Sequence, residues 1–243
     1  MSRSNPSEHL ANPSTRWFEW NGEKGLVRYY DKDKKENVDV PLPFSFILLD
    51  RLGCVGGWHD PSQSGIYSNE VKDTRADILV VKAFKGGTIA EGLYKDIKDR
   101  VNSAGGSFVA NCYIGFKNAD GLKIGSIKFK GAALGAWMDF EKANRTGLYD
   151  GTITIHGFTE GKKGRVEFKM PSFKTGGISP EANAQAIDLD KVVQRFLAAY
   201  LKRNKRDQVE ASAPPAHHVT DEDIAWQDNP AAVSAITDDD IPF

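Results

Sequence analysis

The sequence has few of the features that mark secreted proteins and membrane proteins. It holds only two cysteines, Cys54 and Cys112, among 243 residues, and each lies in an apolar stretch. Both therefore fit small buried side chains in a reducing compartment better than a disulfide. No apolar run approaches the roughly 20 residues that cross a bilayer, and the polar start of the chain lacks the apolar core of a secretory signal. We therefore expect a cytoplasmic protein that does not associate with membranes.

The sequence also lacks the common motifs for metals and nucleotides. No pair of Cys or His residues has zinc-ligand spacing, and no Gly-x-x-x-x-Gly-Lys-Ser/Thr run is present. We therefore expect no metal, no cofactor and no enzymatic activity. A nuclease is the alternative, because carboxylates for two-metal chemistry are available at Asp73, Asp77, Asp139 and Glu141, although their spacing fits no nuclease motif.

Basic residues are absent from the last part of the chain. From residue 207 onward there is no Lys or Arg, whereas nine of the 33 acids lie there. Residues 1–206 therefore carry all 32 basic residues against 24 acids (33 minus 9), a net charge of +8, which attracts polyanions. Residues 207–243 are rich in Ala, Pro and Asp, a composition that predicts disorder. We expect a flexible arm (1–14), a DNA-binding domain (15–206) and a disordered acidic tail (207–243).

Short apolar and alternating runs dominate the body of the chain and predict a mainly β fold with a few helices. The expected strands cover 15–20, 26–30, 44–49, 78–84, 108–117, 122–130, 151–158 and 164–170, and the expected helices begin at 88, 132 and 188. The Gly- and Pro-rich stretch 53–65 is expected to be a loop. A β-bulge is expected at Gly125-Ser126. Small β folds with insertions commonly adopt the OB barrel, so we predict an OB-fold-like β-barrel with insertions.

Single-strand binding without sequence readout needs cations for phosphates and aromatic faces for bases. Both residue types recur on three expected hairpins. The candidate DNA-binding residues are Arg16, Trp17, Trp20, Arg28, Tyr29 and Tyr30 on the first, Tyr113, Lys117, Lys123, Lys128 and Lys130 on the second, and Lys162, Lys163, Arg165 and Lys169 on the third. The expected bulge would bring Lys123, Lys128 and Lys130 to one outer face. For each aromatic residue, packing in the core remains an equal alternative.

The last six residues form a second kind of candidate site. Asp238, Asp239 and Asp240 make a dense negative run, and Ile241, Pro242 and Phe243 make an apolar hook that ends in the α-carboxylate. A partner needs an apolar pocket, a basic group for the carboxylate and further cations for the aspartates. The proline restricts the hook and lowers the entropy lost on docking. We therefore predict that these residues bind partner proteins.

The Asp-Asp-Asp-Ile-Pro-Phe end resembles the C-terminal tip of bacterial single-stranded DNA-binding proteins. In that family the tip recruits replication, recombination and repair proteins, which implies the same role for Asp238–Phe243. The body lacks the usual barrel sequence and the Gly/Gln-rich linker of that family. It is more similar to the divergent single-stranded DNA-binding proteins of tailed bacteriophages, which are OB folds with acidic tails. The resemblance assigns no base-stacking residue by position.

The sequence leaves the exact task and the assembly open. A recombination mediator that anneals strands and also binds duplex DNA would use the same positive surface. Homo-oligomers could form through an exposed edge strand or through the helix over 188–205, and neither is required.

Overall fold

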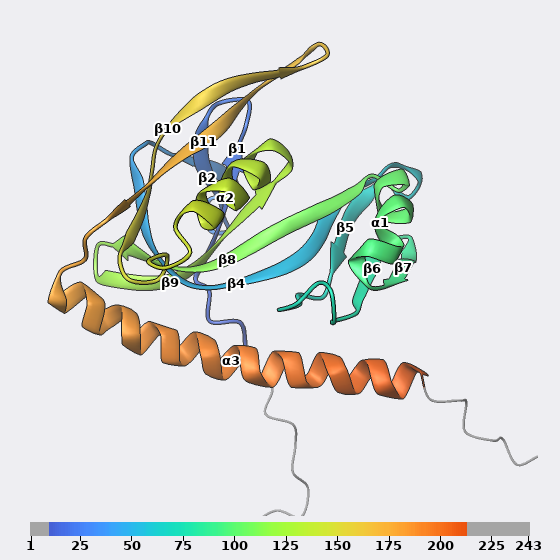
Figure 1. Cartoon of the computed structure of the whole chain (residues 1–243). Helices are drawn as coiled ribbons and strands as arrows, with labels where there is room; N and C mark the ends of the chain where they lie inside the picture. The colour runs from blue at the N-terminus through green and yellow to red at the C-terminus, as the bar shows by residue number, and fades with distance from the viewer. Residues whose placement is uncertain (1–9, 213–243) are drawn as a thin grey trace, which may run out of the picture. The chain divides into compact units, whose positions relative to one another are not determined.

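The computed structural model describes residues 10–212, with side chains as far as residue 205, and eleven strands within them form one mixed sheet (Figure 1). The strands are β1 (Arg16–Asn21), β2 (Leu26–Asp31), β3 (Glu36–Val40), β4 (Phe44–His59), β5 (Ser64–Ser68), β6 (Leu79–Ala83), β7 (Gly87–Gly92), β8 (Gly106–Asn118), β9 (Gly121–Lys130), β10 (Thr152–Lys163) and β11 (Val166–Gly176). Three α-helices accompany them: α1 (Tyr94–Ser103), α2 (Gly131–Ala143) and α3 (Pro180–Ser212). The prediction of a mainly β fold with a few helices is confirmed. Residues up to Asn204 form one unit, to which the following description applies.

The sheet is open, so the predicted closed barrel is not observed. Its order is β3-β2-β1-β9-β8-β4-β5-β6-β7, and β10 pairs with β4 and with β11. β1 and β9 are parallel, whereas the other pairs are antiparallel. β11 approaches the β1–β2 turn, where the Lys169 N–H donates to the Gly22 carbonyl at 2.7 Å. No strand ladder closes this gap among the described residues, because β11 pairs only with β10.

β4 is the longest strand and organises the sheet. It pairs with β8 over most of its length, while its other edge meets β10 first and β5 later. The loop predicted over 53–65 was wrong, because β4 continues to His59 and the chain reverses only at the short 3₁₀ turn Asp60–Ser62. The glycines have a packing role here: a Cβ at Gly57 would lie 2.2 Å from the Gly105 carbonyl oxygen. Glycine therefore permits a close approach of two backbones at this point.

Three hydrophobic clusters stabilise the two sides of this sheet. The largest joins β1, β2, β4, β8, β9 and β10 to α2, with Trp137 of α2 fully buried. A second cluster on the opposite side packs Val193, Phe196 and Leu197 of α3 against β4, β8 and β9. A third joins α1 to β4, β5, β6 and β7. Figure 1 shows α2 and α3 on opposite sides of β4, β8 and β9.

The first predicted helix began too early. Residues from Thr88 onward form β7, and Thr88 is paired with Lys82 of β6. α1 begins only at Tyr94, after Gly92, whose φ of +148° ends the strand in a conformation that glycine adopts readily. The second and third predicted helices are present, and the third is longer than expected.

The β-bulge predicted at Gly125-Ser126 is absent. β8 and β9 pair without a register shift from Asn118↔Gly121 to Val109↔Lys130. The two faces of β9 are apolar at different points along the strand. One face is covered by α3 near Ile124, and the other is covered by the main core at Ile127. The pattern therefore reflects two covered faces and not a bulge.

The β10–β11 hairpin extends beyond the rest of the sheet (Figure 1). The predicted turn at residues 160–163 was wrong, because β10 runs to Lys163, which pairs with Val166. The turn consists of Gly164, with φ +63°, and Arg165. Val166 is 66% exposed because it lies past the end of the core. Within residues 10–212, no helix is long and apolar enough to cross a membrane.

Candidate nucleic-acid interface

One face of the sheet can be followed from β2 toward its centre by cross-strand pairs. Directly opposed residues on neighbouring strands project to the same side, and so do alternate residues along one strand. Arg28 of β2 is opposite Glu19 of β1, which is in turn beside Lys128 of β9. Lys130, two residues along β9, is opposite Val109 of β8. The four charged side chains therefore share one face.

The same face continues across β4, β5 and β6. Val109 is also opposite Cys54 of β4, and Gly56, two residues farther on, is opposite Tyr67 of β5. Tyr67 is opposite Lys82 of β6. We call this surface the aromatic–basic face; its exposed or half-exposed members are Trp17, Arg28, Tyr30, Trp58, Tyr67, Lys82, Phe84, Lys128 and Lys130.

Aromatic side chains are exposed at both ends of this face. Trp17 and Tyr30 are 41% and 54% exposed at one end, and Trp58, Tyr67 and Phe84 are 53%, 48% and 78% exposed at the other. The Tyr67 and Phe84 rings form an edge-to-face pair with centroids 6.4 Å apart. Large apolar side chains that gather on a surface commonly mark an interaction site.

The cations of this face differ in how they are paired. Arg28 forms a 2.6 Å ion pair with Glu19. Lys128 and Lys130 form no direct ion pair with any acid in the described part of the chain. Lys32, on the β2–β3 turn, places its Nζ 4.7 Å from the centre of the Trp17 ring. The centre of the face therefore presents two ammonium groups that are available to phosphates.

A hollow of about 150 Å³ opens at the centre of the aromatic–basic face. Cys54, Tyr67, Glu70, Lys128 and Lys130 are among the residues that line it. Its walls come from β1, β4, β5, β8 and β9, together with the segment that follows β5. The site is therefore held by the most extensively paired part of the sheet and not by loops.

Glu70 is held at this hollow by groups from β8 and α3. Its carboxylate accepts hydrogen bonds from Asn111 Nδ2 at 2.6 Å and from the Tyr113 hydroxyl at 2.8 Å. Its backbone N–H donates to the Tyr200 hydroxyl of α3 at 2.8 Å. Burial raises the pKa of Glu70, whereas these hydrogen bonds and the charge of Lys128 oppose that rise. A carboxylate in this setting is an acceptor for donors that enter the hollow.

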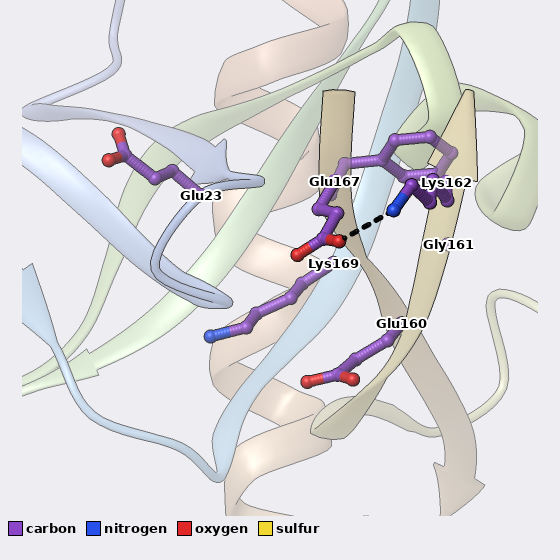
Figure 2. Close-up of a pocket in the computed structure, with 7 residues that line it drawn as sticks. Glu23, Glu160, Gly161, Lys162, Glu167 and Lys169 are labelled. Atoms are coloured by element: carbon purple, nitrogen blue, oxygen red, sulfur yellow. Dashed lines mark hydrogen bonds and ion pairs between the residues drawn. The ribbon is translucent and has the colours of Figure 1, made fainter. Parts of the chain in front are cut away.

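The third predicted basic cluster lies elsewhere, in a groove of about 590 Å³ between the β10–β11 hairpin and the β1–β2 turn. Figure 2 shows Lys162 and Lys169 beside Glu160 and Glu167, and Glu23 of the turn also lines the groove. Lys162 forms a 3.1 Å ion pair with Glu167, and both side chains are exposed. Three glutamates against two lysines make this groove a poor phosphate channel.

The remaining two cations of that cluster lie at the hairpin end. Lys163 and Arg165 are exposed beside and within the turn. Neither shares a strand face with Lys128 or Lys130. The structure therefore does not gather the predicted basic residues into one surface.

Three of the predicted stacking residues are in the interior or are already engaged. Tyr113 is 1% exposed under α3, and Trp20 is buried with its Nε1–H donating to the Lys169 carbonyl at 2.8 Å. Tyr29 is half-buried against the core, and the Arg16 guanidinium lies 4.3 Å from the centre of its ring. The core alternative therefore holds for these rings, and Arg16 is engaged with Tyr29.

Lys117 and Lys123 are separated from the aromatic–basic face. Both lie near the β8–β9 turn, and Lys123 is opposite Phe116, a residue of the main core. Lys123 is thus on the sheet side opposite Lys128, contrary to the single outer face that the expected bulge implied. Distance along the strand also separates Lys123 from the lysines of the aromatic–basic face, because the seven residues from Lys123 to Lys130 span about 23 Å.

Sequence reasoning missed Trp58, Tyr67, Lys82 and Phe84. Trp58 was placed in a loop, and Phe84 was placed at the end of the strand predicted over 78–84. A signal was present in the sequence, because Gly65 and Tyr67 are alternate residues of one run and Trp58 lies shortly before them. A glycine beside exposed rings leaves room for them on the surface. A Cβ at Gly65 would have no heavy atom within 4 Å.

The carboxylates considered for a nuclease do not assemble. Asp73 and Asp77 belong to one turn, where the Asp73 N–H donates to Asp77 Oδ2. Glu141 of α2 pairs with Arg51 at 3.1 Å. Among the residues that the structure describes, no group of three or more His, Cys, Asp or Glu could hold a metal ion.

Comparisons of the chain with known protein families, with curated proteins and with solved structures found no match. The predicted partner-binding residues Asp238–Phe243, the arm at 1–9 and most of the acidic tail lie outside the described residues.

Proposed function

We propose that this protein binds single-stranded DNA without sequence readout along the aromatic–basic face during replication, recombination or repair. The observation that carries the proposal is the alignment, on one sheet face, of five exposed aromatic rings with Lys128 and Lys130, which form no direct ion pair with any acid of the described residues. Cations attract the phosphates, and the rings offer surfaces on which bases stack. The net charge of +8 in residues 1–206 adds long-range attraction.

The exposed rings favour single strands over duplex DNA. In a duplex the faces of the bases are stacked on one another, so only edges and phosphates are accessible. Rings that stand on a sheet surface gain stacking contacts only from unpaired bases. A surface built for duplex backbone alone would need the cations and not Trp17, Trp58 or Phe84.

The proposal also gives Asp238–Phe243 the role of recruiting other DNA-processing proteins. This role rests on the resemblance of these residues to the tip of bacterial single-stranded DNA-binding proteins. On the same resemblance we propose that the protein is phage-encoded and works in the cytoplasm of a bacterium. The acidic run and the apolar hook suit a basic partner with an apolar pocket.

Fluorescence anisotropy with labelled DNA tests the binding class. The probe is an oligo-dT of about 20 nucleotides, longer than the roughly 4–16 nucleotides that one OB domain covers, and the competitor is a duplex of equal length. We expect preferential binding of the single strand and quenching of tryptophan fluorescence. Equal affinity for duplex would favour an annealing or mediator protein, and degradation of the probe with Mg²⁺ would favour a nuclease. Absence of binding would refute the proposal.

A further inference from the structure

The hollow at the centre of the aromatic–basic face has the size of a site for one ring system. Its volume of about 150 Å³ corresponds to about five water molecules and is below the roughly 300–1,000 Å³ of sites for larger ligands. Cys54 and Val109 give it apolar walls, and Tyr67 stands at its border. Gly56 leaves the backbone of β4 without a side chain over the hollow. A flat aromatic group can therefore lie against the strand.

The charged groups that line the hollow are Glu70, Lys128 and Lys130, together with Glu19, which is paired with Arg28. Glu70 contributes a carboxylate, which only accepts hydrogen bonds, and Lys128 contributes an ammonium, which only donates them. Each oxygen of Glu70 already accepts one hydrogen bond, from Asn111 or from Tyr113. A carboxylate has about four lone-pair sites in total. Glu70 can therefore accept two more donors from a ligand.

Folding alone does not explain a carboxylate at this position. Burial raises the pKa of Glu70, which means that the protein destabilises its charged form. The Oδ1 atom of Asn111 has no hydrogen-bond partner in the described structure. A glutamine at position 70 could donate to that atom after rotation of the Asn111 amide and still accept from Tyr113. A neutral residue would satisfy the fold better. Titratable groups whose pKa is perturbed by burial, as that of Glu70 is, are concentrated at functional sites.

We propose that this hollow accepts one guanine base of the bound strand, with Glu70 as the hydrogen-bond acceptor and Lys128 as the donor. The inference rests on the proposed function and gives a base preference to an otherwise sequence-independent surface. Guanine presents two adjacent donors, N1–H and the N2 amine, to the two free acceptor sites of Glu70, and its O6 can accept from Lys128. Thymine presents N3–H between two carbonyl oxygens, which the carboxylate repels.

Oligonucleotides with one changed base test this proposal on the unmodified protein. The reference is oligo-dT, and in each test strand one central thymine is replaced by guanine, inosine or adenine. We expect guanine to tighten binding about tenfold, the range of one bidentate base contact. Inosine, which lacks the N2 amine, should lose most of this gain, and adenine should gain less than guanine. Equal affinities of all strands would overturn the base site while leaving single-strand binding intact.

Glu70→Gln tests the residue that is assigned to recognition. In the variant the ratio of the affinities for the guanine strand and for oligo-dT should fall to about one. Glu160→Gln, a change of the same kind on the exposed hairpin, is the control and should keep the preference. Retention of the guanine preference in a folded Glu70→Gln variant would overturn the role of Glu70. Failure of the wild type to bind any of the strands would instead refute the proposed function itself.

Discussion

The centre of the sheet and the β10–β11 hairpin contain similar residue types but present different chemistry. At the centre, Lys128 and Lys130 have no direct ion-pair partner among the described residues and lie between exposed aromatic rings. At the hairpin, Lys162 pairs with Glu167, and Glu23 and Glu160 line the same groove. The hairpin holds more lysines in the sequence (Lys162, Lys163, Lys169 and Lys174) than the centre of the sheet (Lys128 and Lys130). They differ in how many of these charges remain available.

The difference shows that strand register decides whether a cation can serve a phosphate. Lys162 is directly opposite Glu167 in the hairpin, so the two side chains lie on one face and neutralise each other. Lys130 is opposite Val109, an apolar residue. We therefore assign DNA binding to the aromatic–basic face, and the predictions below compare it with the hairpin.

The largest expected effect follows loss of the exposed rings. Trp58→Ala combined with Phe84→Ala should weaken oligo-dT binding about a hundredfold, because each stacked base contributes about 1–3 kcal/mol. Fluorescence anisotropy measures the change. Tyr149→Ala, which removes a ring that is 52% exposed beyond the end of α2, is the matched control and should change the affinity less than about twofold. Equal losses in both variants would contradict the assignment.

Charge removal should separate the two regions by salt dependence. Lys128→Gln with Lys130→Gln should reduce the slope of log affinity against log salt by about 1.4, since each phosphate contact on a single strand contributes about 0.7. Lys162→Gln with Lys163→Gln removes the same charge from the hairpin and should change the slope by less than half as much. A larger change in the hairpin variant would reverse the comparison.

Replacement of Glu70 should change stability in a pH-dependent way. The raised pKa means that the folded protein holds a proton more tightly than the unfolded chain, so the wild type loses stability as the pH rises from the ordinary glutamate range through the raised value. The groups that face the Glu70 carboxyl are the same in the wild type and in the Glu70→Gln variant: Lys128, Tyr113, Cys54 and Tyr200. Glu70→Gln should remove this loss and raise the free energy of unfolding above that range. Urea titrations at several pH values measure it, and a less stable variant would contradict the account.

The smallest effect is expected at the tip of the hairpin. Val166→Ala should change the free energy of unfolding by less than about 0.5 kcal/mol, because the side chain is 66% exposed. Ile127→Ala, in the fully buried core, should cost about 2–5 kcal/mol. Thermal or urea unfolding compares the two. A large loss from Val166→Ala would show that the hairpin tip is covered in solution.

Local patterns predicted the elements of the fold better than their arrangement. The alternation over 108–116 located β8, and the apolar runs at 44–49 and 78–84 located parts of β4 and β6. The extension of β4 through 53–59 was not predictable from composition. Glycines usually indicate loops, yet Gly57 is required here by the backbone of Gly105, a residue distant in sequence.

The candidate site was predicted only in part for a related reason. Trp17, Arg28, Tyr30, Lys128 and Lys130 were chosen from composition and lie on the aromatic–basic face. Tyr113 alternates correctly for an exposed face, but α3, which comes about 70 residues later, covers it. Trp58 lies on β4 and Phe84 directly follows β6, two strands that are joined through β5. Long-range pairing of this kind leaves no mark in a local window of sequence.

Lysine footprinting by acetylation and mass spectrometry tests the central claim most directly. The full chain is labelled with and without saturating oligo-dT, so that no variant is needed. We expect protection of Lys128, Lys130 and Lys82, with Lys162 and Lys163 labelled equally in both samples. Protection of the hairpin lysines with unchanged labelling of Lys128 and Lys130 would contradict the account.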